Sequence, residues 1–180
     1  NIDLVDAKIY SNYAKNGGAI CAHDAVTINS ESTSFYDNTA TQYGGAILTT
    51  LDASILLHNT IMVGNKAAWG GAIATLGNID SSIVLDNVTM SGNIVTEEGG
   101  AIYTENADVL ALNSIIFANY KDTESNDLYV DNNHVLNMAY SIFGSSNILY
   151  SEDSYSVLQL VPSTHSVERI FQTYTVNENG

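Results

Sequence analysis

The tetrapeptide Gly-Gly-Ala-Ile occurs four times without change, at residues 17–20, 44–47, 70–73 and 99–102. Successive copies begin 26 to 29 residues apart. Self-similarity at a period of about twenty to fifty residues is the signature of one supersecondary unit that is stacked repeatedly. The chain is therefore expected to form a solenoid, in which each unit contacts mainly its neighbours.

A second landmark has the same period: an apolar residue followed by Asn three positions later. The copies are Ile9 and Asn12, Phe35 and Asn38, Met62 and Asn65, Met90 and Asn93, Ile116 and Asn119, with Ile142 and Ser145 as a weakened sixth. Seven residues before each landmark stands a β-branched residue: Ile2, Ile28, Ile55, Ile83, Val109 and Val135. One structural position per coil is therefore occupied by the same kind of side chain throughout.

Short alternating runs rich in Ile, Val, Leu and Thr, bounded by Gly, Asn and Ser, predict strands. A propeller blade needs about 40 residues for four strands, whereas about 27 suit one coil of a three-strand parallel β-helix. We therefore predict an all-β parallel β-helix of about six coils of 26–29 residues over residues 1–150. The columns fade beyond about residue 150, so residues 151–180 are expected to be a degenerate final coil or a C-terminal cap.

The repeated polar residues are expected to be structural. Gly-Gly marks a tight corner, and one Asn per coil suits an amide ladder running along the stack. A second ladder is predicted three residues before each landmark: Asp6, Ser32, Asn59, Asn87 and Asn113. In the fifth copy, Asn126-Asp127-Leu128-Tyr129 replaces Gly-Gly-Ala-Ile.

Two sets of residues compete for the inward face of the strand after Gly-Gly. One comprises the alanine of the tetrapeptide and its partner two residues later: Cys21, Leu48, Ala74, Tyr103 and Val130. The other comprises the isoleucine and its partner: Ala22, Thr49, Thr75, Thr104 and Asp131. We favour the first set inside, which would make Cys21 a small buried thiol.

Composition narrows the classes of function. The chain carries 20 acidic and 5 basic side chains, a net charge of −15. Phosphate binding needs a basic surface, so nucleic acid and anionic membranes are not expected partners. A single cysteine excludes an internal disulfide framework, and the absence of any run of eighteen apolar residues predicts no membrane insertion by this segment. The opening residues look like the middle of a repeat, so we expect part of a longer chain or one without its leader.

The alternation of Gly-Gly-Ala-Ile with an element such as Phe35-Tyr36-Asp37-Asn38 resembles the polymorphic membrane protein repeats of bacterial autotransporter adhesins. Similar repeats occur in archaeal and protist adhesin-like surface proteins, within the pectin-lyase-like β-helix superfamily. The resemblance covers about residues 9–145, although only one copy of the second motif keeps its Phe. It implies a right-handed, single-stranded parallel β-helix at the cell surface or outside the cell. It also implies an adhesive, passenger or stalk role, with a host or neighbouring cell-surface protein or glycan as partner. The motif residues are structural, so no catalytic residue is carried over.

The same fold hosts enzymes that cleave polysaccharides, which makes a lyase or glycoside hydrolase the main alternative. Hydrolysis would need converging carboxylates, and the candidates lie in consecutive turns before the glycine corner: Glu97, Glu98, Asp122, Glu124 and Asp127. No basic residue stands near them in register, so a solvated acidic edge is the preferred interpretation. That edge could hold calcium, which takes oxygen ligands from loops, but the nonapeptide of calcium-binding β-rolls is missing.

Tyr43 and Trp69 each precede a Gly-Gly pair, so they should stack at one corner of adjacent coils. They are expected either to pack over the glycines or to contact a sugar ring or a protein partner. We predict no catalytic, cofactor or metal site. The preferred function is a non-catalytic structural or adhesive segment, and the alternatives are a polysaccharide-cleaving enzyme and a carbohydrate- or calcium-binding module.

Overall fold

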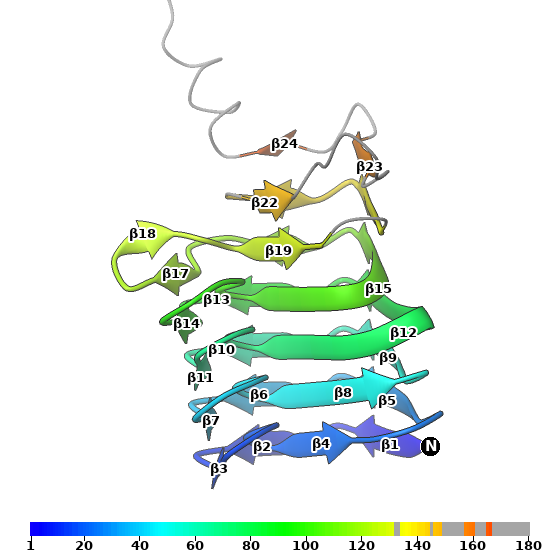
Figure 1. The fold of residues 1–180 in the computed structure, drawn as a ribbon, viewed down its shortest axis with the longest axis vertical. Coiled ribbons are helices and arrows are strands. Elements are labelled where there is room, and N and C mark those ends of the chain that lie inside the picture. Colours follow the sequence, from blue (N-terminus) through cyan, green and yellow to red (C-terminus); the bar gives the residue numbers. More distant parts are fainter. Residues whose placement is uncertain (132–133, 145, 149–156, 161–164, 167–180) are drawn as a thin grey trace, which may run out of the picture.

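In a computed structural model the chain is a parallel β-solenoid of about five turns, close to the six expected (Figure 1). The structure describes residues 1–131, 134–144, 146–148, 157–160 and 165–166. Each turn lies as a layer on the previous one, with the N-terminus at one end of the stack. The described residues contain strands and turns but no helix, and hence no helix that could cross a membrane.

The largest sheet has eleven strands. They are β1 (Ile2–Val5), β4 (Ile20–Ala22), β5 (Thr27–Glu31), β8 (Ile47–Leu51), β9 (Ser54–His58), β12 (Ile73–Asp86), β15 (Ile102–Leu112), β19 (Leu128–Val130), β20 (Val135–Ala139), β22 (Ser146–Ile148) and β23 (Val157–Leu160). The long strands β12 and β15 combine the strand after Gly-Gly with the next one, and a register irregularity lies between Leu76 and Ser81.

Two further sheets complete each coil. The second contains β2 (Lys8–Tyr10), β6 (Ser34–Tyr36), β10 (Ile61–Val63), β13 (Thr89–Ser91), β16 (Ile115–Ile116), β21 (Ile142–Phe143) and β24 (His165–Ser166). The third contains β3 (Tyr13–Ala14), β7 (Thr39–Ala40), β11 (Lys66–Ala67), β14 (Ile94–Val95), β17 (Tyr120–Lys121) and β18 (Glu124–Ser125). The pairings are parallel except between β17 and β18, which form a short antiparallel pair.

The register confirms the predicted apolar columns through the first five coils. Ile28 pairs with Ile2 and with Ile55, and the column continues through Ile83 to Val109. The landmark column likewise runs from Ile9 through Phe35, Met62 and Met90 to Ile116. From Phe35 onward these landmark side chains are fully buried.

The predicted alignment is wrong by one residue near the C-terminal end. Val109 pairs with Leu136 rather than Val135, and Ile116 pairs with Phe143 rather than Ile142. Leu128 takes the place of the repeated isoleucine because it pairs with Ile102. A constant step of 26 residues fails once a coil gains one residue, and the core then takes the side chain that restores the burial pattern. The proposed partner of the sixth landmark, residue 145, lies outside the described residues.

The strand after Gly-Gly turns the isoleucine, not its neighbour, toward the core. Ile47, Ile73 and Ile102 belong to the central hydrophobic cluster. Leu48 and Tyr103 are buried too, but they lie outside this cluster. The structure therefore favours the set that we had not preferred, with Thr49, Thr75 and Thr104 as buried partners. Cys21, expected to be buried, is exposed.

The Asn ladder is present and has a direction. The Nδ2 of Asn38 donates to Oδ1 of Asn65 at 3.0 Å, and that of Asn65 donates to Oδ1 of Asn93 at 2.9 Å. The same link joins Asn12 to Asn38 at 2.9 Å and Asn93 to Asn119 at 2.8 Å. Each of these acceptor oxygens also accepts the backbone N–H of the preceding rung. A buried amide therefore satisfies backbone and side-chain donors at once.

The second predicted ladder marks a corner in the left-handed backbone region. Its residues have φ between 47° and 55°, in a list of Asp6, Ser32, Asn59, Asn87 and Asn113. Asn and Asp tolerate this conformation because their short polar side chains bond locally. The glycine corner is tighter still: a Cβ on Gly45 would lie 2.0 Å from the carbonyl oxygen of Gly71. Both corners thus follow from local backbone chemistry.

The described parts of residues 151–180 continue the stack. β23 pairs in parallel with β20, and β24 pairs in parallel with β21. The remaining residues of the expected degenerate coil or cap lie outside the described part of the chain.

Candidate functional site

The predicted aromatic pair exists and belongs to a larger cluster. The rings of Tyr43 and Trp69 stack with centroids 4.9 Å apart and planes 20° apart. Tyr103 lies 6.4 Å from Tyr43 in a tilted arrangement, and it stacks on Tyr129 at 4.7 Å. Our sequence reasoning missed both of these tyrosines. Their signal was available, because they occupy the same register position on consecutive coils.

The stacking favours packing over sugar binding for these aromatic residues. Rings that stack on one another along the solenoid cover their own faces, whereas a sugar platform must leave a ring face free. Tyr103 is 7% exposed, and its hydroxyl donates to the carboxylate of Glu105. Burial, followed by this hydrogen bond, raises the pKa of Tyr103 far above its ordinary value. The cluster therefore behaves as a covering layer over the strand after Gly-Gly.

The structure does not bring the four residues of the predicted acidic edge together. Glu97 and Asp122 are exposed, and Glu98 is half-buried. Asp127 is fully buried at the end of the Asn ladder, where its Oδ1 accepts from Nδ2 of Asn119 at 2.7 Å. Asp127 therefore completes the scaffold and does not lie on an exposed edge.

The expectation that no basic residue approaches this edge is wrong. The Nζ of Lys121 lies 2.8 Å from Oε1 of Glu98, and Nδ2 of Asn126 donates to Oε2 of Glu98 at 2.8 Å. The hydrogen bond to Glu98 raises the pKa of Lys121. In the described part of the chain, no three His, Cys, Asp or Glu residues are arranged to hold a metal ion.

The most concave surface is a groove of about 330 Å³ that crosses the first four coils on the outer side of the largest sheet. Its lining comes from β1, β5, β9 and β12 and consists of Asp3, Leu4, Val5, Asn29, Ser30, Glu31, Leu56, Leu57, His58, Val84 and Asp86. We call this surface the outer groove. None of its lining residues was among the candidate site residues chosen from the sequence.

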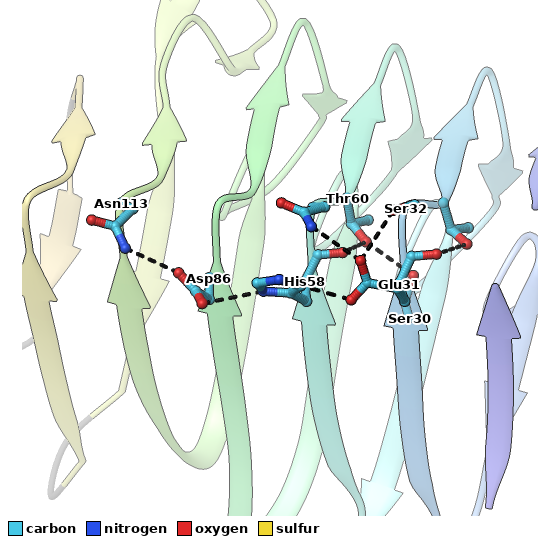
Figure 2. A network of polar contacts seen from close by, with 9 residues as sticks. Ser30, Glu31, Ser32, His58, Thr60, Asp86 and Asn113 are labelled. Carbon is cyan, nitrogen blue, oxygen red and sulfur yellow. Dashed lines mark hydrogen bonds and ion pairs between the residues drawn. The ribbon is translucent and has the colours of Figure 1, made fainter. Parts of the chain in front are cut away.

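One rim of the outer groove is a row of stacked polar residues, shown in Figure 2. Glu31, His58 and Asp86 occupy one register position on three consecutive strands. His58 lies between the two carboxylates: Nε2 is 3.8 Å from Oε2 of Glu31, and Nδ1 is 3.1 Å from Oδ2 of Asp86. When its imidazole is protonated, His58 joins three coils by ion pairs.

Amides from the left-handed corner hold the carboxylates of this rim. Asn59 donates to Glu31 at 3.0 Å, and Asn113 donates to Asp86 at 3.1 Å (Figure 2 labels Asn113). The hydrogen bond from Asn59 is the main reason why the pKa of Glu31 is lowered. The rim therefore keeps negative charge at its surface at neutral pH.

The floor of the outer groove is apolar. Leu56 is 40% exposed and lies between Asn29 and Val84 in the register. Val5, at the end of the groove, is 66% exposed. On the far side Nδ2 of Asn29 donates to Oδ1 of Asp3 at 2.5 Å. The groove thus combines an apolar floor with carboxylates on both sides.

Two segments, residues 32–50 and 87–105, match the Chlamydia polymorphic membrane protein repeat. The chain carries polymorphic membrane protein repeats. Each matched segment begins at or next to the left-handed corner and runs through the landmark, the ladder Asn and Gly-Gly-Ala-Ile. No curated protein and no solved structure matched the chain.

The polymorphic membrane protein repeats cover the scaffold and leave out the outer groove. Glu31 and Asp86 each directly precede a matched segment, and Leu56, His58 and Val84 lie between the two. The buried landmark and ladder residues, by contrast, lie inside the segments, as Phe35 and Asn93 do. The repeats therefore account for the solenoid, whereas the groove is a feature of the residues between them.

Proposed function

We propose that this chain is a segment of a cell-surface or secreted adhesin-like protein and acts as a non-catalytic structural and adhesive scaffold. The repeats belong to a family of non-enzymatic surface proteins. The observation that carries the proposal is the burial of the repeated residues: the ladder residues Asn38, Asn65, Asn93 and Asn119 are all 0% exposed. The repeats thus build a rod, while the outer positions are free to differ and to contact partners.

The partner that fits this proposal is a protein or glycan on a host or neighbouring cell, met outside the cell that makes the chain. The net charge of −15 disfavours nucleic acid and anionic membrane surfaces as partners. Exposed apolar residues are spread over the outer faces, and examples are Tyr13 at 75% and Ile61 at 49%. A solenoid offers long surfaces of this kind, which suit contact with large partners.

A polysaccharide lyase gains little support from the one basic residue near the acidic edge. A lyase base must take up a proton from its substrate, which needs a pKa near the working pH. The pKa of Lys121 is raised by Glu98, so its amine stays protonated. Calcium and carbohydrate binding remain outcomes for which the experiment below provides a readout.

The test coats beads with the purified chain and counts beads retained on cultured epithelial cells and on a glycan-coated surface. The matched control is Gly45→Val, which places a side chain on the Gly71 carbonyl and removes the fold. We expect retention of the native chain well above the control, and no change on adding calcium or EDTA. Equal retention of both would refute the adhesive role. Release of unsaturated uronides from pectate by the native chain would refute the non-catalytic role.

A further inference from the structure

The outer groove carries three carboxylates without a permanent cation. Asp3, Glu31 and Asp86 all line it, and the ion pairs of this rim involve only His58. In the described part of the chain no lysine or arginine pairs with these three carboxylates, and Lys121 is engaged by Glu98 elsewhere. The groove therefore has a negative rim that a positively charged partner would complement.

Between these carboxylates the floor presents aliphatic rather than aromatic groups. Leu56 stands at an outward position where an alternating strand ordinarily carries a polar side chain, and it is 40% exposed. Val84 follows it on the next coil in register. Aliphatic side chains suit apolar side chains of a partner, whereas a sugar ring is usually held against an aromatic face.

The size of the groove fits a short extended segment. Four coils at a spacing of about 4.8 Å make a track about 14 Å long, which an extended chain covers with four or five residues at about 3.3 Å each. Such a segment places successive side chains on opposite sides, so apolar and basic residues can alternate between the floor and the rim.

We propose that the outer groove binds an extended segment of a partner protein in which basic and apolar side chains alternate. The apolar side chains lie on Leu56 and Val84, and the basic ones pair with Glu31 and Asp86. This inference rests on the proposed adhesive function and names the chemistry of the partner. His58 adjoins both carboxylates and sets where the basic groups can sit.

The test measures fluorescence anisotropy of a labelled peptide, (Lys-Leu)3, at pH 7.5 and low salt. The peptides (Glu-Leu)3 and (Lys-Ser)3 separate the charge from the apolar contribution. We expect binding of (Lys-Leu)3 only, weakened about fivefold to tenfold in the variant E31Q/D86N, because two surface ion pairs are lost. Leu56→Ser should weaken it by a similar factor through the lost apolar contact.

Two matched variants control for general effects of charge and apolarity. E97Q/D122N removes two exposed carboxylates from another part of the surface, and Ile61→Ser removes a comparably exposed apolar side chain on β10. Both should leave the affinity within twofold. Equal weakening by E97Q/D122N, or no weakening by E31Q/D86N, would overturn the proposal.

A charge reversal provides a second readout that does not depend on loss of binding. The variant E31K/D86K should bind (Glu-Leu)3 in preference to (Lys-Leu)3, and unchanged preference contradicts the assignment. The melting temperature of each variant checks that it is folded. If the peptide does not bind but the beads still adhere to cells, the groove proposal fails alone. If the peptide binds but the beads do not adhere, the adhesive function fails.

Discussion

Replacing Asn65 with alanine should destabilise the chain far more than its size suggests. Asn65 is fully buried and its side chain makes four hydrogen bonds: it accepts from N and Nδ2 of Asn38 and donates to Asn93 Oδ1 and Phe35 O. In Asn65→Ala the backbone N–H of Asn38 loses its acceptor, and so does one hydrogen of its amide. Each buried donor left without a partner costs about 1–3 kcal/mol. We therefore expect a loss of roughly 4 kcal/mol in the free energy of unfolding.

Asn12→Ala is the matched control, since it removes the first rung of the same ladder. Asn12 is exposed, so its backbone and the groups that it bonds can turn to water. The expected cost is below about 1 kcal/mol. Urea unfolding can be followed by the fluorescence of Trp69, the single tryptophan, which stacks on Tyr43 near the altered coil. A loss for Asn65→Ala below 1 kcal/mol, or an equal loss for the control, would refute the account of the ladder.

Three further predictions concern the corner and the titrating groups. Gly45→Ala should abolish stable folding because its Cβ would meet the Gly71 carbonyl at 2.0 Å, whereas Gly92→Ala, with open space but a φ of 65°, should cost only about 1 kcal/mol, as circular dichroism melts would show. The lowered pKa of Glu31 adds stability that is present above its ordinary value of 4.5 and is lost as the pH falls through the folded pKa. Glu31→Gln should therefore flatten the fall in melting temperature between pH 5 and 3, and an unchanged slope would contradict the assignment. The raised pKa of Tyr103 adds stability that is present below its ordinary value of 10.0 and is lost at higher pH, so Tyr103→Phe should lessen alkaline unfolding above pH 10, measured by the same melts.

The repeating part of the fold could be predicted because each coil carries the same residues at the same positions. Gly-Gly-Ala-Ile and the ladder Asn mark two corners per coil, which is enough to align Ile28 with Ile55 and Phe35 with Met62. The alignment failed by one residue where the motif disappears, at Leu128 and Phe143. There, only burial distinguishes neighbouring apolar residues, and a fixed step cannot register a coil that is longer by one.

The inward face and the groove were missed for a different reason. Leu48 and Thr49 are both buried, because aromatic side chains cover the outer face of that strand as well. Alternation of polar and apolar residues is therefore weak at this position. The groove residues do not repeat from coil to coil, so a search for self-similarity gives them no weight. The Lys121 and Glu98 pair joins residues 23 apart, a separation outside the repeat period.

The hydrogen bonds of the amide column all run one way, and this sets how the length of such a rod can change. Every internal rung hands its hydrogens to the next one and receives from the one before, so any such rung can follow any other. Asp127 has no amide hydrogen to pass on, and it occurs after the last asparagine of the column. Removal or duplication of one whole turn upstream of Asp127, from one asparagine to the next, would rejoin matching donors and acceptors. Genes of this kind can therefore gain or lose complete turns by recombination without redesign of the interior.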